Sequence, residues 1–572
     1  MRIFNRTKTV VHDIAPDEIF LDAHNLPHFN RDQFEGKIEK PISRRALFLF
    51  SMSLCLLGMV AIGRVFFLQV VQGESYALHA RNNWLDEEII FSQRGLILDR
   101  TGEKLAWNES RIGTTTGEEA EDTFPFRRYD PHPALSHILG YVRYPQKDRN
   151  GNYFQDAVVG VEGLERVYDD TLSGAQGHVI TERDALNTVV SQSTIDTPVD
   201  GQPLQLTIDA RLQKALYDFA EELSKDVGFS GGAGVVIDVA TGELIVSMSM
   251  PGYDPNVLAD ASDSDAVQAY LDDPQVPFLN RAVGGLYTPG SILKPFFAIG
   301  ALAEGIVTPE KEFYSDGALR VPNPYNPDQP TIFKDWKAHG WVDMRRALAV
   351  SSNVYFMTIG GGFGDQKGLG IQNIEKYVRM FTIAQKTGVD IPGEVEGVIP
   401  SIAWKKKLFP DDPWRLGDTY NSSIGQYGFQ ATPLQMARAV AMIANGGLTV
   451  VPHAHADTTV VPVGTIPISQ EVFQVVREGM RASVLDGTAR ALNVPYVNIA
   501  GKTGTAELGV SKEKVNSWIM GFWPYENPRY AFAMVMEKGP VTNLIGSASV
   551  MRRFFDWMHQ NAPEYLDTSA GA

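Results

Sequence analysis

The longest apolar stretch of the chain lies near its N-terminus. Residues 46–63 read ALFLFSMSLCLLGMVAIG without a charge, and after Arg64 the apolar character continues to Val71. About 20 apolar residues span a bilayer as a helix, and an Arg near one end can reach the interface. Basic residues precede this run and acidic residues follow it: Arg31, Lys37, Lys40, Arg44 and Arg45 before, and Glu74, Asp86, Glu87 and Glu88 after. The asymmetry predicts a single-pass anchor at 46–71, with a cytoplasmic tail (1–45) and the rest of the chain outside.

Two other interpretations of the apolar run were weighed. A cleaved signal peptide would use Ala61-Ile62-Gly63 as its cleavage site, but 45 residues are too many for its basic leader, and the run continues past that site. A buried core helix disagrees with the length of the run and with the basic cluster beside it. An uncleaved anchor in the cell membrane therefore remains the favoured interpretation.

The pattern after the anchor is one of short strands and turns up to about residue 205. Strand-like segments at 88–91 and 95–98 lead into a turn at Arg100-Thr101-Gly102, and the polar, acidic stretch 114–123 is typical of a loop. We interpret 72–205 as a non-catalytic, largely β domain.

The pattern changes near Pro203. Residues 204–208 alternate like a strand, and Asp209 then opens an amphipathic helix that Gly228 closes. Apolar segments at 234–238 and 244–248 flank a turn, and two more at 518–522 and 530–536 are joined by another, as in antiparallel sheets. Helices packed on such a sheet predict an α+β domain over 206–561, followed by a flexible tail at 562–572.

Composition and charge narrow the functional classes. The 572 residues carry a formal net charge of −17, which argues against a nucleic-acid partner because phosphate backbones require a basic surface. The single cysteine, Cys55, rules out an intramolecular disulfide and a Cys-based zinc site. The sequence holds no HExxH motif and no Gly-rich phosphate loop preceding a Lys-Ser/Thr pair.

The first candidate catalytic motif is Ser291-Ile292-Leu293-Lys294, preceded by Pro289-Gly290. We expect Ser291 to start a helix with an apolar face, so that Lys294, three positions on, shares the face of the serine. The N-terminus of a helix favours developing negative charge, and a buried Lys with a lowered pKa can accept the hydroxyl proton. The same spacing occurs at Ser511 and Lys514, where the crowded charges and the missing Pro-Gly turn indicate a solvated loop.

Two further motifs follow in order. In Ser351-Ser352-Asn353, a hydroxyl and an amide two positions apart can face one cleft if the backbone turns there, although helix capping is the simpler interpretation of this motif alone. In Lys502-Thr503-Gly504-Thr505, a predicted strand over 496–500 enters a segment able to offer a cation, a hydroxyl and a backbone N–H to a peptide carboxylate. The similar Lys386-Thr387-Gly388 leads into a turn instead. S-x-x-K, S-x-N and K-T-G in this order form the motif set of penicillin-binding proteins and class A β-lactamases.

The chain resembles the class B penicillin-binding proteins over roughly residues 60–560. Besides the three motifs, the segments that carry the likeness are GRVFFLQVVQGESY, QRGLILDRTGEKLA, GVEGLERVYDDTLSGAQG, SMPGYDPN, SIGQYGFQATPLQMARAVAMIANGG and DGTARAL. Phe555-Asp556-Trp557 and the YDPN segment favour the elongation-type penicillin-binding protein 2 subfamily. Asn516-Ser517-Trp518 departs from that subfamily, in which many members have a His before an Ala-Trp pair.

The resemblance implies a β-lactam-sensitive peptidoglycan D,D-transpeptidase that requires no metal or organic cofactor. It also implies that 72–205 is a pedestal domain of the dimerisation type. It assigns Ser291 as the nucleophile, Lys294 as its base, Ser351 as a proton shuttle and Asn353 as a ligand of the donor stem peptide. Lys502, Thr503, Gly504 and Thr505 are implied to hold the substrate carboxylate, and the Ser291 and Thr505 N–H groups to form the oxyanion hole. The implied partners are stem peptides on lipid-linked nascent glycan and a polytopic glycan polymerase of the shape, elongation, division and sporulation (SEDS) type.

Rival functions remain at this point. A D,D-carboxypeptidase or β-lactamase-type hydrolase would share the fold and the motifs, but it needs neither anchor nor pedestal. A β-lactam sensor would need a cytoplasmic signalling domain larger than 45 residues, and a dead scaffold would not need three intact motifs.

Overall fold

The computed structural model describes most of the chain after residue 42. The described residues are 43–74, 85–109, 125–147, 153–155, 157–183, 189–260, 263–323, 326, 328–460, 463–509 and 511–567. Contacts divide the chain into two compact units, one of Met1–Asp86 with Thr181–Ser191 and the other of Glu87–Ile180 with Gln192–Ala572. The predicted loop at 114–123 and nearly all of the predicted N-terminal tail lie outside the described residues.

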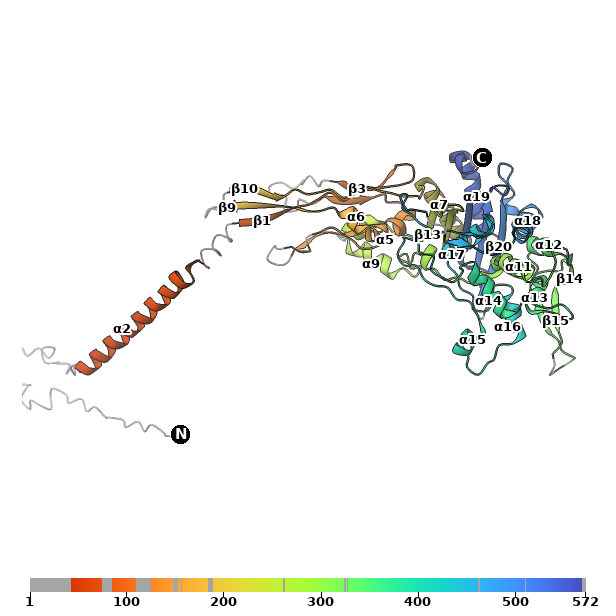
Figure 1. Ribbon diagram of the computed structural model, residues 1–572, viewed down its shortest axis with the longest axis horizontal. Helices are drawn as coiled ribbons and strands as arrows, with labels where there is room; N and C mark the ends of the chain where they lie inside the picture. The colour runs from red at the N-terminus through yellow and green to blue at the C-terminus, as the bar shows by residue number, and fades with distance from the viewer. Residues whose placement is uncertain are drawn as a thin grey trace, which may run out of the picture. The chain divides into compact units, whose positions relative to one another are not determined.

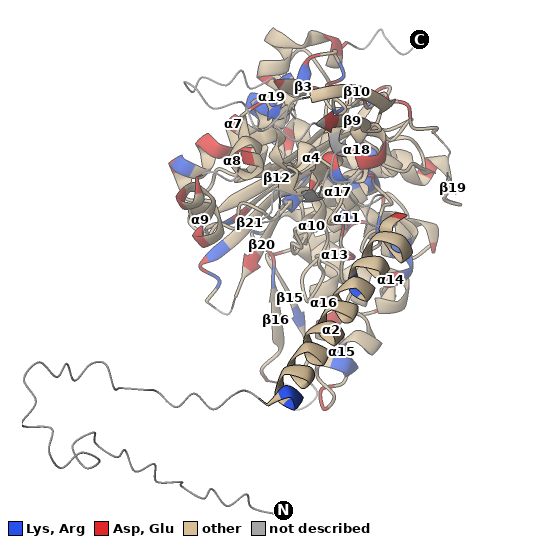
Figure 2. Ribbon diagram, turned by 90° about the vertical axis from the view of Figure 1, so that its left-hand side faces the viewer, with Lys and Arg blue, Asp and Glu red and all other residues tan. Residues whose placement is uncertain are grey.

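The apolar run near the N-terminus forms one continuous helix in the first unit. Helix α2 (Arg44–Phe66) begins at Ser43, whose hydroxyl accepts from the Ala46 N–H at 3.1 Å, and passes directly into η3 (Phe67–Val71). Its 28 residues rise about 42 Å, more than the roughly 30 Å of a bilayer core. Figure 2 shows α2 almost free of charge, with basic residues at its N-terminal end. Of the helices described, this one is long and apolar enough to cross a membrane.

The predicted β-rich region contains small sheets and short helices. A four-stranded sheet has the order β11–β2–β3–β4, with the parallel pair β11 and β2 at one side, and a three-stranded sheet has the order β1–β9–β10. The strands are β1 (Leu85–Ile90), β2 (Ile97–Leu98), β3 (Lys104–Glu109), β4 (Phe126–Tyr129), β5 (Val142–Arg143), β6 (Gln146–Lys147), β7 (Tyr153–Gln155), β8 (Val159–Gly160), β9 (Gly177–Arg183), β10 (Val189–Asp196) and β11 (Leu204–Gln205). The helices are η4 (Pro133–Leu135), α4 (Ser136–Leu139), α5 (Gly163–Val167) and α6 (Asp169–Ser173).

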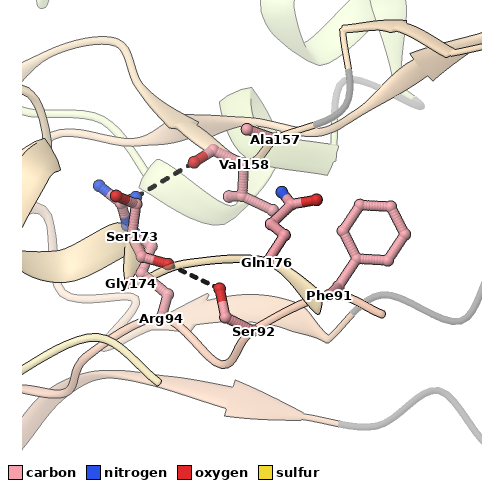
Figure 3. Close-up of a pocket in the computed structure, with 8 residues that line it drawn as sticks. All are labelled: Phe91, Ser92, Arg94, Ala157, Val158, Ser173, Gly174 and Gln176. Atoms are coloured by element: carbon pink, nitrogen blue, oxygen red, sulfur yellow. Dashed lines mark hydrogen bonds between the residues drawn. The ribbon is translucent and has the colours of Figure 1, made fainter. Parts of the chain in front are cut away.

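A buried ion network fixes the centre of this region. The Glu165 carboxylate, fully buried, accepts from Arg94 at 2.5 Å and from Arg127 at 2.7 Å. Beside it lies a cavity of about 90 Å³, where Arg94 donates to the Val158 carbonyl at 3.2 Å and the Ser92 hydroxyl to the Ser173 carbonyl at 2.7 Å (Figure 3). A buried charge is tolerated only when it is paired and hydrogen-bonded, so we interpret this cluster as structural.

A five-stranded antiparallel sheet forms the centre of the larger unit. Its order is β13–β12–β22–β21–β20, which places β20 at an edge. The strands are β12 (Gly231–Asp238), β13 (Leu244–Met250), β20 (Ala500–Leu508), β21 (Lys514–Trp523) and β22 (Tyr530–Pro540). The predicted hairpin at 234–248 and the predicted apolar strands at 518–536 are therefore confirmed.

Helices cover both faces of this sheet because its strands are apolar on both sides (Figure 1). On one face, Val236 packs with α7 (Ala210–Val227) and α19 (Ser547–Asn561). On the other, Val235 packs in one core with α11 (Lys294–Ala303) and α17 (Pro433–Ala444). The predicted α+β class, an antiparallel sheet packed by helices, is confirmed.

The remaining elements surround these layers. The helices are α8 (Pro255–Asp260), α9 (Ser264–Asp272), α10 (Arg281–Gly284), η5 (Gly290–Leu293), α12 (Met344–Val350), α13 (Asn353–Gly361), α14 (Gly370–Met380), α15 (Ile402–Leu408), α16 (Leu416–Ser422), α18 (Gln470–Asp486), η6 (Arg490–Leu492) and η7 (Pro563–Tyr565). The short strands β14 (Phe313–Ser315) and β17 (Gly340–Val342) pair, as do β15 (Ala318–Val321) with β16 (Thr331–Lys334) and β18 (Leu448–Thr449) with β19 (Gly464–Thr465).

Two predicted boundaries have different outcomes. Helix α7 is capped by Asp209, which accepts from the Arg211 N–H at 3.0 Å, and ends at the left-handed Gly228, as predicted. The strand predicted over 496–500 is wrong, because β20 begins only at Ala500. The segment before β20 contacts α19 instead of pairing with a strand. The Tyr496 hydroxyl donates to Asp556 of α19 at 2.7 Å, and the Tyr496 ring stacks on His559.

Candidate active site

Ser291 lies on a tight helical turn against the edge strand of the sheet. The turn η5 (Gly290–Leu293) leads directly into α11, so Lys294 follows Ser291 by one 3₁₀ turn and starts from the same face. Gly290 has φ +59°, and a Cβ there would lie 2.9 Å from the Thr505 carbonyl of β20. The backbone carrying the serine therefore touches the third motif directly.

Glycines and one tryptophan allow this close approach. A Cβ on Gly504 would lie 2.8 Å from the Pro289 carbonyl and 2.9 Å from Ile292, so only glycine fits between β20 and the turn. Behind them, the buried Trp518 donates from its indole nitrogen to the Thr288 carbonyl at 3.0 Å. The position of Ser291 is thus fixed by close main-chain approach to β20 and by the Trp518 side chain of β21.

The second motif forms the turn between two helices. Ser351 ends α12 in the left-handed conformation, with φ +59° and ψ +39°. Ser352 then caps α13, its hydroxyl accepting from the Tyr355 N–H at 3.3 Å, and Asn353 is the first residue of that helix. The backbone does turn at Ser351-Ser352-Asn353, which is the condition for the first and third side chains to face one cleft, and the capping role falls to the middle residue.

The two candidate lysines meet at Ser351. The Lys294 amine donates to the Ser351 carbonyl at 2.7 Å, to the Ser351 hydroxyl at 3.3 Å and to Asn353 Oδ1 at 2.7 Å. The Lys502 amine contacts the same hydroxyl at 2.9 Å and donates to the Thr503 carbonyl at 2.9 Å. The structure therefore joins one residue of each motif through a single serine hydroxyl.

Burial makes both amines weak bases. Both lysines are 0% exposed. Desolvation lowers the pKa of Lys294 to about 7, although the negative charge of Asp335 acts in the opposite direction. Desolvation, together with the positive charge of Lys294, holds the pKa of Lys502 well below its ordinary value. A Lys with its pKa near neutrality can accept a proton from a reacting hydroxyl.

The remaining predicted site residues, Ser291, Thr503 and Thr505, have no hydrogen bond to either lysine amine through their side chains among the described contacts. No hydrogen bond joins Ser291 to Lys294 in the part of the chain that the structure describes, and such catalytic contacts often tighten only when substrate is bound. Thr505 is exposed on β20, whereas Thr503 is half-buried and donates to the Thr488 hydroxyl at 2.6 Å.

Sequence reasoning missed two polar residues at this site. Thr488, which follows α18, donates its N–H to the Ala349 carbonyl of α12 and so connects the second motif with the third. Asp335 contacts Ser352 and Val354 from the opposite side. Asp335 belongs to none of the segments that carry the resemblance, and Thr488 lies in one of them, DGTARAL, to which the sequence assigned no role; the tertiary contacts are what place both at the site.

The two other motif matches, Lys386-Thr387-Gly388 and Ser511 with Lys514, lie outside this site. Lys386 is exposed, and the N–H groups of Thr387 and Gly388 donate to the Glu394 carboxylate at 2.6 and 3.2 Å, which closes the predicted turn. Ser511 is exposed in the loop between β20 and β21, as predicted. Within the described residues, no cluster of three or more His, Cys, Asp and Glu side chains is placed to hold a metal ion.

Comparison with known families agrees with this geometry. A family model described as the penicillin binding protein transpeptidase domain matches residues 232–556, and one described as the penicillin-binding protein dimerisation domain matches residues 120–206. All three motifs fall inside the first match.

Alignments with individual relatives extend over most of this chain. The peptidoglycan D,D-transpeptidase MrdA of Acinetobacter baumannii is 34% identical over 446 residues, which are 72% of this chain and 63% of that protein. MrdA of Escherichia coli is 31% identical over 471 residues, 75% of this chain and 71% of that protein. A solved structure described as "Structural coordination of polymerization and crosslinking by a peptidoglycan synthase complex" aligns with a TM-score of 0.69 at 26% identity, covering 92% of this chain and 98% of that one.

Proposed function

The chain belongs to the penicillin-binding protein transpeptidase family, and from this premise we propose that it is a class B peptidoglycan D,D-transpeptidase of the elongation type. The observation that supports the proposal most strongly is the Ser351 hydroxyl, held between the buried amines of Lys294 and Lys502 beside the turn that carries Ser291. This arrangement provides a nucleophile, a base and a proton route in one place.

In the proposed acylation, the Ser291 oxygen attacks the penultimate D-Ala carbonyl of a stem peptide. The neutral Lys294 amine accepts the hydroxyl proton, which is consistent with its pKa of about 7. When the peptide bond breaks, the departing D-Ala amine needs a proton. The Ser351 hydroxyl, in contact with both amines, can deliver it, so that an ester forms on Ser291 and D-Ala leaves.

Substrate binding is proposed to use the edge of the sheet. β20 is an edge strand, so its outer main-chain groups can pair with an extended peptide, the recognition mode known as strand addition. The exposed Thr505 hydroxyl, with Thr503, would bind the terminal carboxylate, and Asn353 the donor stem amide. Gly504 keeps this part of the strand close to Ser291.

The developing oxyanion requires two donors. The turn carrying Ser291 contacts β20 at Thr505 through Gly290, so the N–H groups of Ser291 and Thr505 belong to adjoining segments. We assign them to the oxyanion hole. An amine of a neighbouring stem peptide would then attack the ester on Ser291, giving a cross-link and restoring the serine.

The anchor and the partners complete the proposal. Helix α2 would hold the protein in the cell membrane, with its basic N-terminal side in the cytoplasm and the catalytic region outside. The similar structure described as a peptidoglycan synthase complex, concerned with polymerization and crosslinking, supports a partnership with a glycan polymerase, for which we propose the SEDS type.

Covalent labelling tests the nucleophile. The full chain in detergent is treated with a fluorescent penicillin beside Ser291→Ala and Ser511→Ala. We expect Ser291→Ala to lose the label completely and Ser511→Ala to keep it, because Ser511 lies in an exposed loop. Lys294→Ala should also lose acylation, since an unactivated serine is a poor nucleophile. Labelling that persists in Ser291→Ala would refute the assignment, and rapid release of the label by the wild type would favour a hydrolase.

A further inference from the structure

The segment Lys334–Trp336, which begins at the last residue of β16, lies against the turn of the second motif. Its three consecutive residues each contact that turn: the Lys334 carbonyl accepts from Asn353 Nδ2 at 3.4 Å, and the Trp336 indole donates to the Val350 carbonyl at 3.1 Å. Between them, Asp335 Oδ2 accepts from the Ser352 hydroxyl at 2.8 Å. A segment that belongs to none of the three motifs therefore contacts the residues that precede and follow Ser351 in the chain.

Asp335 makes the central contacts of this segment. Its side chain is 0% exposed. Besides Ser352, the same oxygen accepts from the Val354 N–H at 3.0 Å and from the Ser315 hydroxyl at 3.3 Å. The Val354 N–H belongs to the first turn of α13, where a helix has unpaired donors and a favourable field for an anion. A buried carboxylate at this position thus fixes where α13 begins.

The turn needs such support because Ser351 has an unfavourable backbone. A non-glycine residue at φ +59° keeps that conformation only where its surroundings enforce it. Trp336 holds Val350, the residue before Ser351, and Asp335 holds Ser352, the residue after it. The hydroxyl of Ser351 is thereby kept at the point where both lysine amines reach it.

Asp335 also contributes charge to the site. The charged and titratable groups that act around the Lys294 amine are Lys502 from β20 and Asp335 and His339 from the connection between β16 and β17, while the ring of Phe356 on α13 lies 5.4 Å away. The His339 ring is buried, with Nε2 3.5 Å from Asp335 Oδ1. Asp335 is the group in this set that carries negative charge.

We propose that Asp335 is a positioning residue of this active site, which holds the Ser351–Asn353 turn in its strained form and supplies the negative charge that acts on Lys294. The inference rests on the proposed function, because it concerns the acylation of Ser291. It predicts two separable effects, one on geometry and one on charge.

Two substitutions separate these effects. In Asp335→Asn, the side-chain oxygen can still accept from Ser352 and Val354, so the turn is kept while the charge is removed. Since the charge of Asp335 raises the pKa of Lys294, its loss lowers that pKa further and leaves more neutral amine at acidic pH. The rise of the acylation rate with pH should therefore move to lower pH. In Asp335→Ala the turn loses its acceptor, and acylation should slow about 10- to 100-fold, as expected for a misplaced catalytic group.

The experiment measures acylation of the full chain in detergent by a fluorescent penicillin across a pH series. Asp343→Asn is the matched control: Asp343 caps the neighbouring helix α12 by accepting from the Arg346 N–H at 2.7 Å, so this variant loses the same charge and keeps a capping acceptor. Its pH profile should coincide with that of the wild type. Melting temperatures show whether each variant is folded.

The outcomes distinguish this inference from the proposed function. An Asp335→Asn profile that coincides with the wild type overturns the inference, whatever Asp335→Ala does. An acid-shifted profile in Asp335→Asn, absent from Asp343→Asn, supports it. A wild-type chain that is not acylated at all would instead refute the proposed function.

Discussion

The two Lys-Thr-Gly matches provide a direct test of the active-site assignment. Lys502 is 0% exposed and its amine lies 2.9 Å from the Ser351 hydroxyl, whereas Lys386 is exposed at a turn. Lys→Met removes the amine but keeps most of the apolar stem, so it is the appropriate change at a buried site. We expect Lys502→Met to slow acylation strongly and Lys386→Met to leave it unchanged.

The magnitude follows from what Lys502 contacts. Without its amine, the Ser351 hydroxyl keeps only the longer 3.3 Å contact to Lys294, and the positive charge beside the departing group is lost. Removing one preorganised group of this kind costs about 3 kcal/mol in the transition state, or roughly 10²–10³ in rate. Stability should change little, because the substitution removes a poorly solvated amine and retains apolar contacts.

The control is set by the turn at Lys386. There the backbone N–H groups of Thr387 and Gly388 bind Glu394, and the Lys side chain itself points to solvent. Exposed substitutions of this kind usually change stability by less than about 0.5 kcal/mol.

The assay measures the acylation rate of the full chain with a fluorescent penicillin, together with the melting temperature of each variant. A slow Lys386→Met beside a normal Lys502→Met would refute the reasoning and require a different active site.

Two further predictions concern pH and topology. Acylation should increase as the pH rises through about 7, because the pKa of Lys294 is about 7 and only its neutral amine can accept the Ser291 proton; a rate independent of pH in this range would contradict the role of Lys294 as base. A reporter fused after residue 80 should be active only outside the cytoplasm, and the mature protein should retain residue 1, whereas an N-terminus at Arg64 would indicate a cleaved signal peptide.

Much of the fold could be predicted where local chemistry determines structure. The Asp209 and Gly228 caps defined α7, and the apolar strands of the sheet were recognisable from their periodicity and turns. The three motifs were found because their order and their local structure are specific. Those features depend on residues close together in sequence.

The rest depends on contacts between distant segments. The start of β20 was misplaced because Tyr496 is drawn towards Asp556, 60 residues away. Asp335 and Thr488 were missed because their partners at Ser352 and Thr503 lie 17 and 15 residues away, in separate elements. Asp335 stands alone in a connection, and the DGTARAL segment that contains Thr488 did not reveal which of its residues reaches the active site.

The packing of the Ser291 turn also determines when an enzyme molecule becomes competent during its synthesis. The indole that supports Thr288 comes from Trp518, 230 residues later, and Lys502 reaches Ser351 across 151 residues. Contacts this distant in sequence form late, after the intervening chain has emerged from the ribosome N-terminus first. A truncated or unfinished chain that ends before β20 contains Ser291 and Lys294 but lacks the strand against which they are positioned. Such an incomplete molecule therefore lacks the arrangement on which the proposed acylation of Ser291 depends.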